Sequence, residues 1–181
     1  SDHLDGEVVD GNARLQALDD GNWANAVLAK LPKQPSLDPQ IAEPVRVTKV
    51  LKPTSQQKLS NGKIVLDFGQ NLVGRARFRL SGATYQKVVV RYAEMLNEDG
   101  SAYFANLRGA PSIDTFYMNG KREWYTTHFT YHGFRYAEIE GQGDAVEAEA
   151  EVFHTAAPET ASFACSNPMF ERIWQNVEWT Q

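Results

Sequence analysis

The feature that most constrains this fold is a series of short segments, beginning at Val45, in which apolar and polar residues alternate. A period of two puts successive side chains on opposite faces of a half-buried β-strand. Turn residues separate the segments, and Asn61-Gly62 supplies the positive φ angles that a two-residue hairpin turn requires. The pattern predicts strands over residues 45–51, 64–68, 74–80, 87–94, 113–118, 123–131, 134–140 and 148–154.

No amphipathic helix of a dozen residues interrupts this series, which is typical of a sandwich or barrel rather than of βαβ units. We therefore predict an all-β protein with an antiparallel, jelly-roll-like β-sandwich over residues 45–157. Residues 1–44 are expected to be irregular. Four prolines restrict the backbone over residues 31–44, which predicts an extended linker. A turn at residues 19–22 is expected to precede a buried Trp23.

The last segment predicts a helix. Asn167 is a good N-cap, and Pro168 is favourable at the first helical position. Apolar residues then recur at helical spacing, at Phe170, Ile173, Trp174 and Val177. An apolar helical stripe has to be covered, either by the sandwich or by a further domain.

Composition excludes several classes of protein. The 181 residues carry a net charge of −5, with 42% hydrophobic and 23% charged residues, which excludes a disordered chain. Mild acidity argues against a nucleic-acid partner, and no apolar run predicts a membrane span. Residues 1–12 lack the pattern of a signal peptide. The single Cys165 forms no internal disulfide, so a cytoplasmic and a secreted or periplasmic location both remain open.

Carboxylates are the main candidates for catalytic chemistry. Glycoside hydrolysis needs two of them flanking the scissile bond. The candidates are Asp67, Glu94, Asp99, Asp114, Glu138 and Glu140. The alternative, which we favour, is that these acids lie at strand edges in solvent, because charged residues are mostly exposed. His128 and His132 have no zinc-site spacing and are expected to be ordinary strand residues beside aromatic neighbours.

Two predicted turns are rich in oxygen ligands. Asp67, Gln70 and Asn71 fall in one turn, and Asn106 and the Pro111 carbonyl fall in another. Calcium takes six to eight such oxygens, and loops at one end of a sandwich could bring the two turns together. The alternative is that the asparagines bond their own loop backbone.

Two adjacent aromatic residues, Tyr103 and Phe104, fall in a loop where both rings do not easily point inward. Sugars stack on exposed aromatic rings, whereas aromatics at alternate strand positions are more often core residues. Tyr103 and Phe104 are therefore the candidate substrate-binding residues.

Several motifs occur in a characteristic order. They are Asp-Phe-Gly-Gln-Asn-Leu-Val-Gly (67–74), Tyr-Ala-Glu-Met-Leu (92–96), Asn-Leu-Arg-Gly-Ala (106–110), Phe-Thr-Tyr-His-Gly-Phe-Arg-Tyr (129–136) and the closing segments 162–168 and 174–181. This succession closely resembles the bacterial α-L-rhamnosidases, a family of multidomain glycoside hydrolases. The match spans residues 64–181, with a looser match at residues 6–10.

The resemblance implies a domain map. Residues 1–44 would be the tail of a preceding domain and a linker, and residues 45–157 the β-sandwich that precedes the catalytic domain. Residues 158–181 would be a linker and the first helix of a truncated (α/α)6 catalytic barrel. The family's catalytic carboxylates lie in that barrel, so the resemblance implies that this chain is a fragment with no catalytic residue and no activity of its own.

The resemblance also implies a ligand. Some family members use this sandwich as a calcium-dependent rhamnose-binding module. Carried over by position, the metal ligands are Asn71, Asn106 and Pro111, with Gln70 in the same turn. Gln70 lacks the charge that a carboxylate would bring to the ion. The implied partners are rhamnose-containing glycosides and the missing barrel. A ligand-free structural spacer and a stand-alone lectin-like protein are the alternatives.

Overall fold

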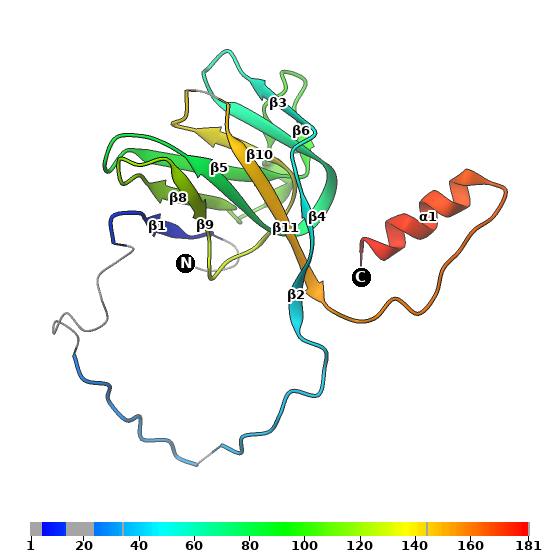
Figure 1. Cartoon of the computed structure of the whole chain (residues 1–181), viewed down its shortest axis with the longest axis horizontal. Coiled ribbons are helices and arrows are strands. Elements are labelled where there is room, and N and C mark those ends of the chain that lie inside the picture. The colour runs from blue at the N-terminus through cyan, green and yellow to red at the C-terminus, as the bar shows by residue number, and fades with distance from the viewer. Residues whose placement is uncertain (1–4, 14–23, 34, 144, 181) are drawn as a thin grey trace.

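The computed structural model describes residues 5–13, 24–33, 35–143 and 145–180 (Figure 1). The turn and buried aromatic expected at residues 19–23 lie outside these residues. The elements are β1 (Val8–Asp10), β2 (Val45–Leu51), β3 (Ser55–Lys58), β4 (Ile64–Leu80), β5 (Lys87–Ala93), β6 (Met95–Leu96), β7 (Ala102–Tyr103), the short 3-10 helix η1 (Ala105–Leu107), β8 (Ile113–Tyr117), β9 (Glu123–Thr126), β10 (His132–Glu140), β11 (Glu147–Thr155) and α1 (Pro168–Glu178).

One long strand, β4, organises the main sheet. Its first part, residues 64–67, lies between β3 and β10. Its last part pairs with β11 over residues 74–79 and with β9 over residues 77–80. The main sheet has nine strands: seven in the order β1-β8-β5-β10-β4-β11-β2, and β3 and β9, which each pair with β4 off this path. Because β4 exchanges its neighbours along its length, the sheet curls over its own core. This curled sheet, with one C-terminal helix, confirms the predicted all-β fold class.

Ring contacts show that the curl closes around a core. Phe78 of β4 and Phe116 of β8 are 6.3 Å apart between ring centroids, although two strands separate β4 from β8 in the sheet. Phe116 also meets Tyr125 of β9 at 5.9 Å. All three side chains are fully buried. Alternation along β4 places Ala76, Phe78 and Leu80 in this core, as the period-two pattern predicted.

The turn expected between residues 68 and 74 is wrong, because β4 continues through it. In its place β4 carries an extended bulge. Leu72 pairs with Phe134 and Asp67 pairs with Tyr136, so that four residues of β4, 68–71, lie opposite Arg135 of β10 alone. Extra residues in one strand loop out locally without ending it, and Gly69 supplies the positive φ of 75° at this point.

Other strand boundaries also differ from the prediction. The strand expected over residues 123–131 ends at Thr126, and β10 begins already at His132. Strands β1, β3, β6 and β7 were not predicted. β1 pairs with β8 in parallel, so the sheet is mixed rather than wholly antiparallel. Strands of two to four residues carry too little alternation to be recognised from a single sequence.

The segments that precede and follow the sandwich in the sequence are mostly exposed to solvent. Residues 24–33 and 35–44 form no helix or strand and follow an extended course, as predicted for residues 31–44 (Figure 1). Helix α1 begins as expected, with the Asn167 side chain accepting a hydrogen bond from the Met169 amide at 3.0 Å. None of its residues is buried. No described helix is long and apolar enough to cross a membrane.

Candidate functional site at the Glu94 carboxylate

Two asparagines from distant segments meet at one carboxylate. Asn71 lies in the bulge of β4, Asn106 lies in η1, and Glu94 directly follows β5. The Asn71 amide donates to one Glu94 oxygen at 3.2 Å, and the Asn106 amide donates to the other at 3.4 Å. All three residues are exposed. The structure therefore gathers one carboxylate and two amides, all oxygen-bearing groups, at a solvent-accessible edge of the sandwich.

The bulge that carries Asn71 is fixed by an ion pair. Arg135 makes two hydrogen bonds of 2.8 Å to the two carboxylate oxygens of Asp67. Asp67 also accepts a hydrogen bond from the Gly69 amide at 2.7 Å. The hydrogen bond from Arg135, helped by the Gly69 amide, lowers the pKa of the Asp67 carboxyl. Asp67 is thus committed to holding the bulge in shape, and its side chain does not reach out as a free ligand.

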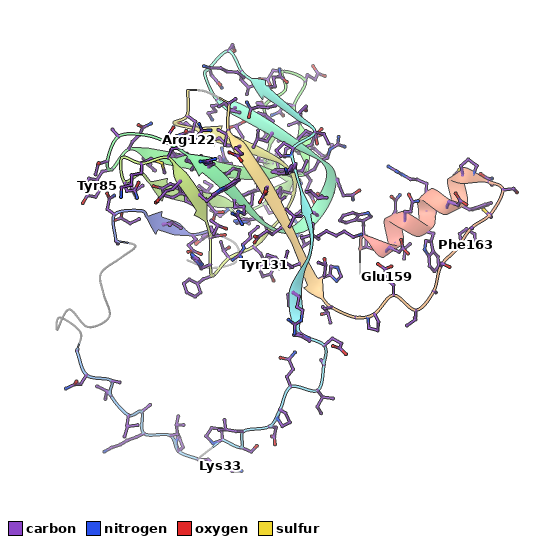
Figure 2. The ribbon with its side chains drawn as sticks, viewed as in Figure 1. Lys33, Tyr85, Arg122, Tyr131, Glu159 and Phe163 are labelled. Atoms are coloured by element: carbon purple, nitrogen blue, oxygen red, sulfur yellow. The ribbon has the colours of Figure 1, made fainter. Side chains whose placement is uncertain are left out.

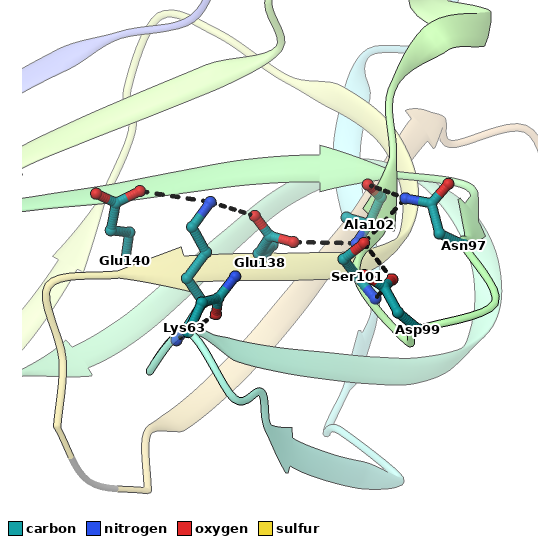
Figure 3. A network of polar contacts seen from close by, with 8 residues as sticks. Lys63, Asn97, Asp99, Ser101, Ala102, Glu138 and Glu140 are labelled. Atoms are coloured by element: carbon teal, nitrogen blue, oxygen red, sulfur yellow. Dashed lines mark hydrogen bonds and ion pairs between the residues drawn. The ribbon is translucent and has the colours of Figure 1, made fainter.

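The loop that carries Asn106 is fixed by a buried carboxylate, as Figure 3 shows. Glu138 of β10 is only 4% exposed. Its carboxylate accepts a hydrogen bond from the Ala102 amide at 3.0 Å and forms an ion pair with Lys63 at 2.9 Å. Asn97, Asp99 and Ser101 bond one another in the preceding turn. Because β7 starts at Ala102, Glu138 fixes the point from which the chain runs on to Asn106.

Among the contacts of the described residues, none joins the other predicted site residues to the Glu94 carboxylate. Gln70 donates to the Asn71 carbonyl at 2.9 Å, whereas the Asn71 and Asn106 amides donate to Glu94 and not to their own loop backbone. Pro111 is exposed in the loop after η1. The Phe104 ring is covered by Arg91, whose guanidinium lies 3.7 Å from the ring centroid. Tyr103 is half-buried in β7, opposite Met95.

The structure also contains a buried chain of polar contacts through Ser112, His132 and Asp114. Ser112 Oγ lies 3.1 Å from His132 Nδ1, and His132 Nε2 lies 3.2 Å from Asp114 Oδ1. The His132 ring stacks on Tyr92 at 4.3 Å, which agrees with its expected place beside aromatic neighbours. Burial, strengthened by the Asp114 charge, raises the pKa of the Tyr92 hydroxyl well above its usual value. All four residues are buried, so we assign this chain of contacts to the packing of the core.

The carboxylates illustrate what sequence reasoning missed. Asp114 and Glu138 are buried, so the expectation that these acids lie in solvent is wrong for both. Glu94 was one of six interchangeable candidates, and no local pattern distinguishes it. Its partners lie 23 and 12 residues away in the chain. Within the described part of the chain, no group of three His, Cys, Asp or Glu residues could hold a metal, so any cation here would depend on amide and carbonyl oxygens besides the Glu94 carboxylate.

Comparison of the chain with known proteins identifies its family. A family model described as the bacterial alpha-L-rhamnosidase concanavalin-like domain matches residues 57–156. An alpha-L-rhamnosidase from Streptomyces avermitilis is 36% identical over 190 residues, covering 100% of this chain and 18% of the relative. One from Alteromonas sp. is 32% identical and covers 98% of this chain and 20% of its own length. The chain thus spans about one fifth of these curated relatives.

Solved structures agree with the sequence match. The structure of alpha-L-rhamnosidase from Dictyoglumus thermophilum is 33% identical, with a TM-score of 0.88 over 98% of this chain and 21% of that chain. The Streptomyces avermitilis enzyme complexed with L-rhamnose is 41% identical, with a TM-score of 0.75 over 78% of this chain and 14% of its own. With a family model over more than half of its residues and a shared fold at this identity, the chain belongs to the bacterial alpha-L-rhamnosidase family, and its curled sheet is that family's concanavalin-like domain.

Proposed function

We propose that this chain is the sandwich segment of an enzyme that hydrolyses terminal α-L-rhamnosides, and that the Glu94 site binds a terminal rhamnose together with calcium. The observation that carries the proposal is the meeting of Asn71 and Asn106 on Glu94. Family membership and the L-rhamnose complex of the Streptomyces avermitilis relative support a rhamnoside as the substrate.

The residues present fit calcium in chemical type. Glu94, Asn71 and Asn106 offer a carboxylate and two amides, and a half-turn of each amide about its terminal bond would present oxygen in place of nitrogen. The Pro111 carbonyl and the Gln70 amide oxygen are the further candidates. A calcium site with only one charged ligand binds the ion weakly, with a dissociation constant of about 10⁻⁴–10⁻³ M. Bound calcium would supply positive charge for the hydroxyl oxygens of a sugar.

The test is calorimetry of the chain with L-rhamnose in several millimolar calcium and again with excess chelator. We expect binding heat that chelator abolishes and added calcium restores. Asn71→Ala, Asn106→Ala and Glu94→Gln should each remove the heat while leaving the melting temperature within a few degrees. Gln142→Ala is the matched control, because this half-buried amide lies in the β10–β11 connection and bonds Ser81 and Gly141. Absence of heat in saturating calcium would refute the binding role.

A structural spacer is the second candidate. It is favoured by the fact that Glu94 already accepts hydrogen bonds from both asparagines, so the three side chains could serve only to hold η1 against the bulge. This reading predicts no sugar binding and a measurable loss of stability in each variant. Both readings place the catalytic carboxylates outside residues 1–181. The chain alone should therefore not cleave an aryl α-L-rhamnoside, and turnover above background would contradict both.

A further inference from the structure

The extended segment of residues 24–33 and 35–44, here called the strap, exposes apolar side chains to an unusual degree. Val27, Leu28, Leu37 and Ile41 are each more than 90% exposed, and Leu31 is 57% exposed. Figure 2 shows the side chains of the strap standing out from an open arc around Lys33. Scattered single apolar residues on a surface are ordinary, but five along twenty residues of extended chain mark an interaction site.

The strap and α1 leave the sandwich at the same place. The strap ends at Pro44, directly before β2, and Thr155 at the end of β11 pairs with Val45. The Pro44 carbonyl accepts a hydrogen bond from the Ala156 amide at 3.0 Å, so the two connections leave the sheet next to each other before they diverge (Figure 1). Helix α1 carries its own apolar stripe of Phe170, Ile173 and Val177, each about half exposed. A single body lying beyond this end of the sheet could contact both.

The strap is not fixed by its own contacts. Apart from the bond between Pro44 and Ala156 at its end, the hydrogen bonds found among the described strap residues are local, namely Ser36 to Asp38 and Gln40 to Ala42 and Glu43. Fixing a residue's backbone costs about 1–2 kcal/mol of conformational entropy, so an extended course needs external contacts to persist. The Dictyoglumus thermophilum structure nevertheless matches 98% of this chain, strap and helix included, and its chain is about five times as long.

We propose that the strap and the apolar face of α1 dock together on one apolar surface of the same polypeptide, formed by residues outside 1–181. The described strap carries Lys30 and Lys33 against Asp38 and Glu43, so its net charge is zero and its partner surface is expected to be apolar rather than charged. The inference rests on the proposed place of this chain in a longer enzyme, and it does not depend on calcium or rhamnose binding.

Hydrogen exchange tests the proposal directly. We compare the chain of 181 residues with the full polypeptide that contains it. In the chain alone the strap amides should exchange at the rate of an unfolded peptide, whereas in the full polypeptide they should exchange ~10-fold or more slowly. Equal, rapid exchange in both proteins would overturn the proposal. Strap protection in the chain alone, together with a dimer in sedimentation, would also overturn it, because a second copy would then be the occupant.

Substitutions give an independent readout. The double variant Leu28→Asp, Ile41→Asp should lower the melting temperature of the full polypeptide by several degrees and leave the chain of 181 residues unchanged, because both side chains are fully exposed there. Ser36→Asp is the control for added negative charge at an exposed polar position of the strap, with one added charge against the two of the double variant. If the double variant and the control both lowered the melting temperature of the full polypeptide only slightly and by the same amount, docking of the strap would be contradicted. Rhamnose calorimetry on the chain alone decides the binding role separately.

Discussion

The ion pair between Asp67 and Arg135 makes the shape of the β4 bulge depend on pH. The hydrogen bond from Arg135 holds the pKa of Asp67 below its ordinary value. A carboxylate whose pKa is lower in the folded than in the unfolded state stabilises the fold when it is ionised. This stabilisation is fully present above the unfolded-state pKa of about 3.9 and is lost as the pH falls through the folded-state pKa. Because both side chains are partly exposed, solvent screening limits this contribution to about 1 kcal/mol.

We therefore expect Arg135→Met to lower the free energy of unfolding by about 1 kcal/mol at neutral pH. The difference from the unsubstituted chain should shrink below about pH 4 and vanish once Asp67 is protonated in the folded state. Urea denaturation at several pH values measures this. Arg122→Met, at an exposed arginine in the turn before β9 (Figure 2), should show no pH-dependent difference. A loss that stays constant down to pH 2 would show that the charge on Asp67 is not its cause.

Single side chains also show how far the sequence specified the candidate site. That the turns of the two asparagines come together was one of two open interpretations of the sequence, and the structure places both asparagines on one carboxylate. Their role as metal ligands remains a prediction. Glu94 and the supporting Glu138 could not be predicted, because their importance comes from partners up to 75 residues away and from register, which a local pattern does not contain. Arg135 is likewise defined only by the bulge that it faces.

At the scale of elements, the period-two pattern predicted both faces of the second part of β4. Its outward-facing arginines form a ladder with β11, in which Arg75 meets Glu151 at 2.7 Å and Arg79 meets Glu147 at 3.1 Å. Alternation fixes which residues face out, because one face of the strand is buried. The change of neighbours from β10 to β11 was not predictable, since it depends on how closely two backbones approach rather than on polarity.

Gly74 is the residue that permits this change of neighbours. It pairs with His132 on one side and Val152 on the other. A Cβ at this position would lie 2.0 Å from the Glu151 carbonyl oxygen, which is far inside van der Waals contact. Gly74→Ala must therefore push β11 away from β4. We expect a loss of about 2–3 kcal/mol in the free energy of unfolding, measured as a lower urea midpoint.

Gly109 supplies the matched control for this substitution. A Cβ there meets nothing within 4 Å, so Gly109→Ala should change stability by no more than a few tenths of a kcal/mol. A Gly74→Ala variant as stable as this control would show that β4 and β11 separate freely, and that the close approach does not determine the curl of the sheet.

At the scale of the whole molecule, the fold is closed by residues from near the start of the described chain. The Glu7 side chain accepts hydrogen bonds from the amides of His128 and Phe129 at 2.9 and 2.7 Å, across more than 120 positions in sequence. Its own amide donates to buried Asp114 at 3.0 Å. These contacts seat β1 beside β8 and cover an edge strand that would otherwise be open. Nothing in the local sequence around residue 7 predicts partners so distant.

Glu7→Ala should therefore act far beyond its own neighbourhood. Two part-buried amides, those of the exposed residues His128 and Phe129, would lose their acceptor, which predicts a loss of about 1–3 kcal/mol in the free energy of unfolding. Glu7→Gln retains an acceptor oxygen, so its free energy of unfolding should fall by less than half as much. Glu43→Ala, in the exposed strap, should not measurably change the free energy of unfolding. Hydrogen exchange would localise the effect: the Glu7→Ala variant should show faster exchange in β1 and β8 before β4 and β11. If all strands lose protection equally, β1 is part of the cooperative core rather than a separable cover of the β8 edge.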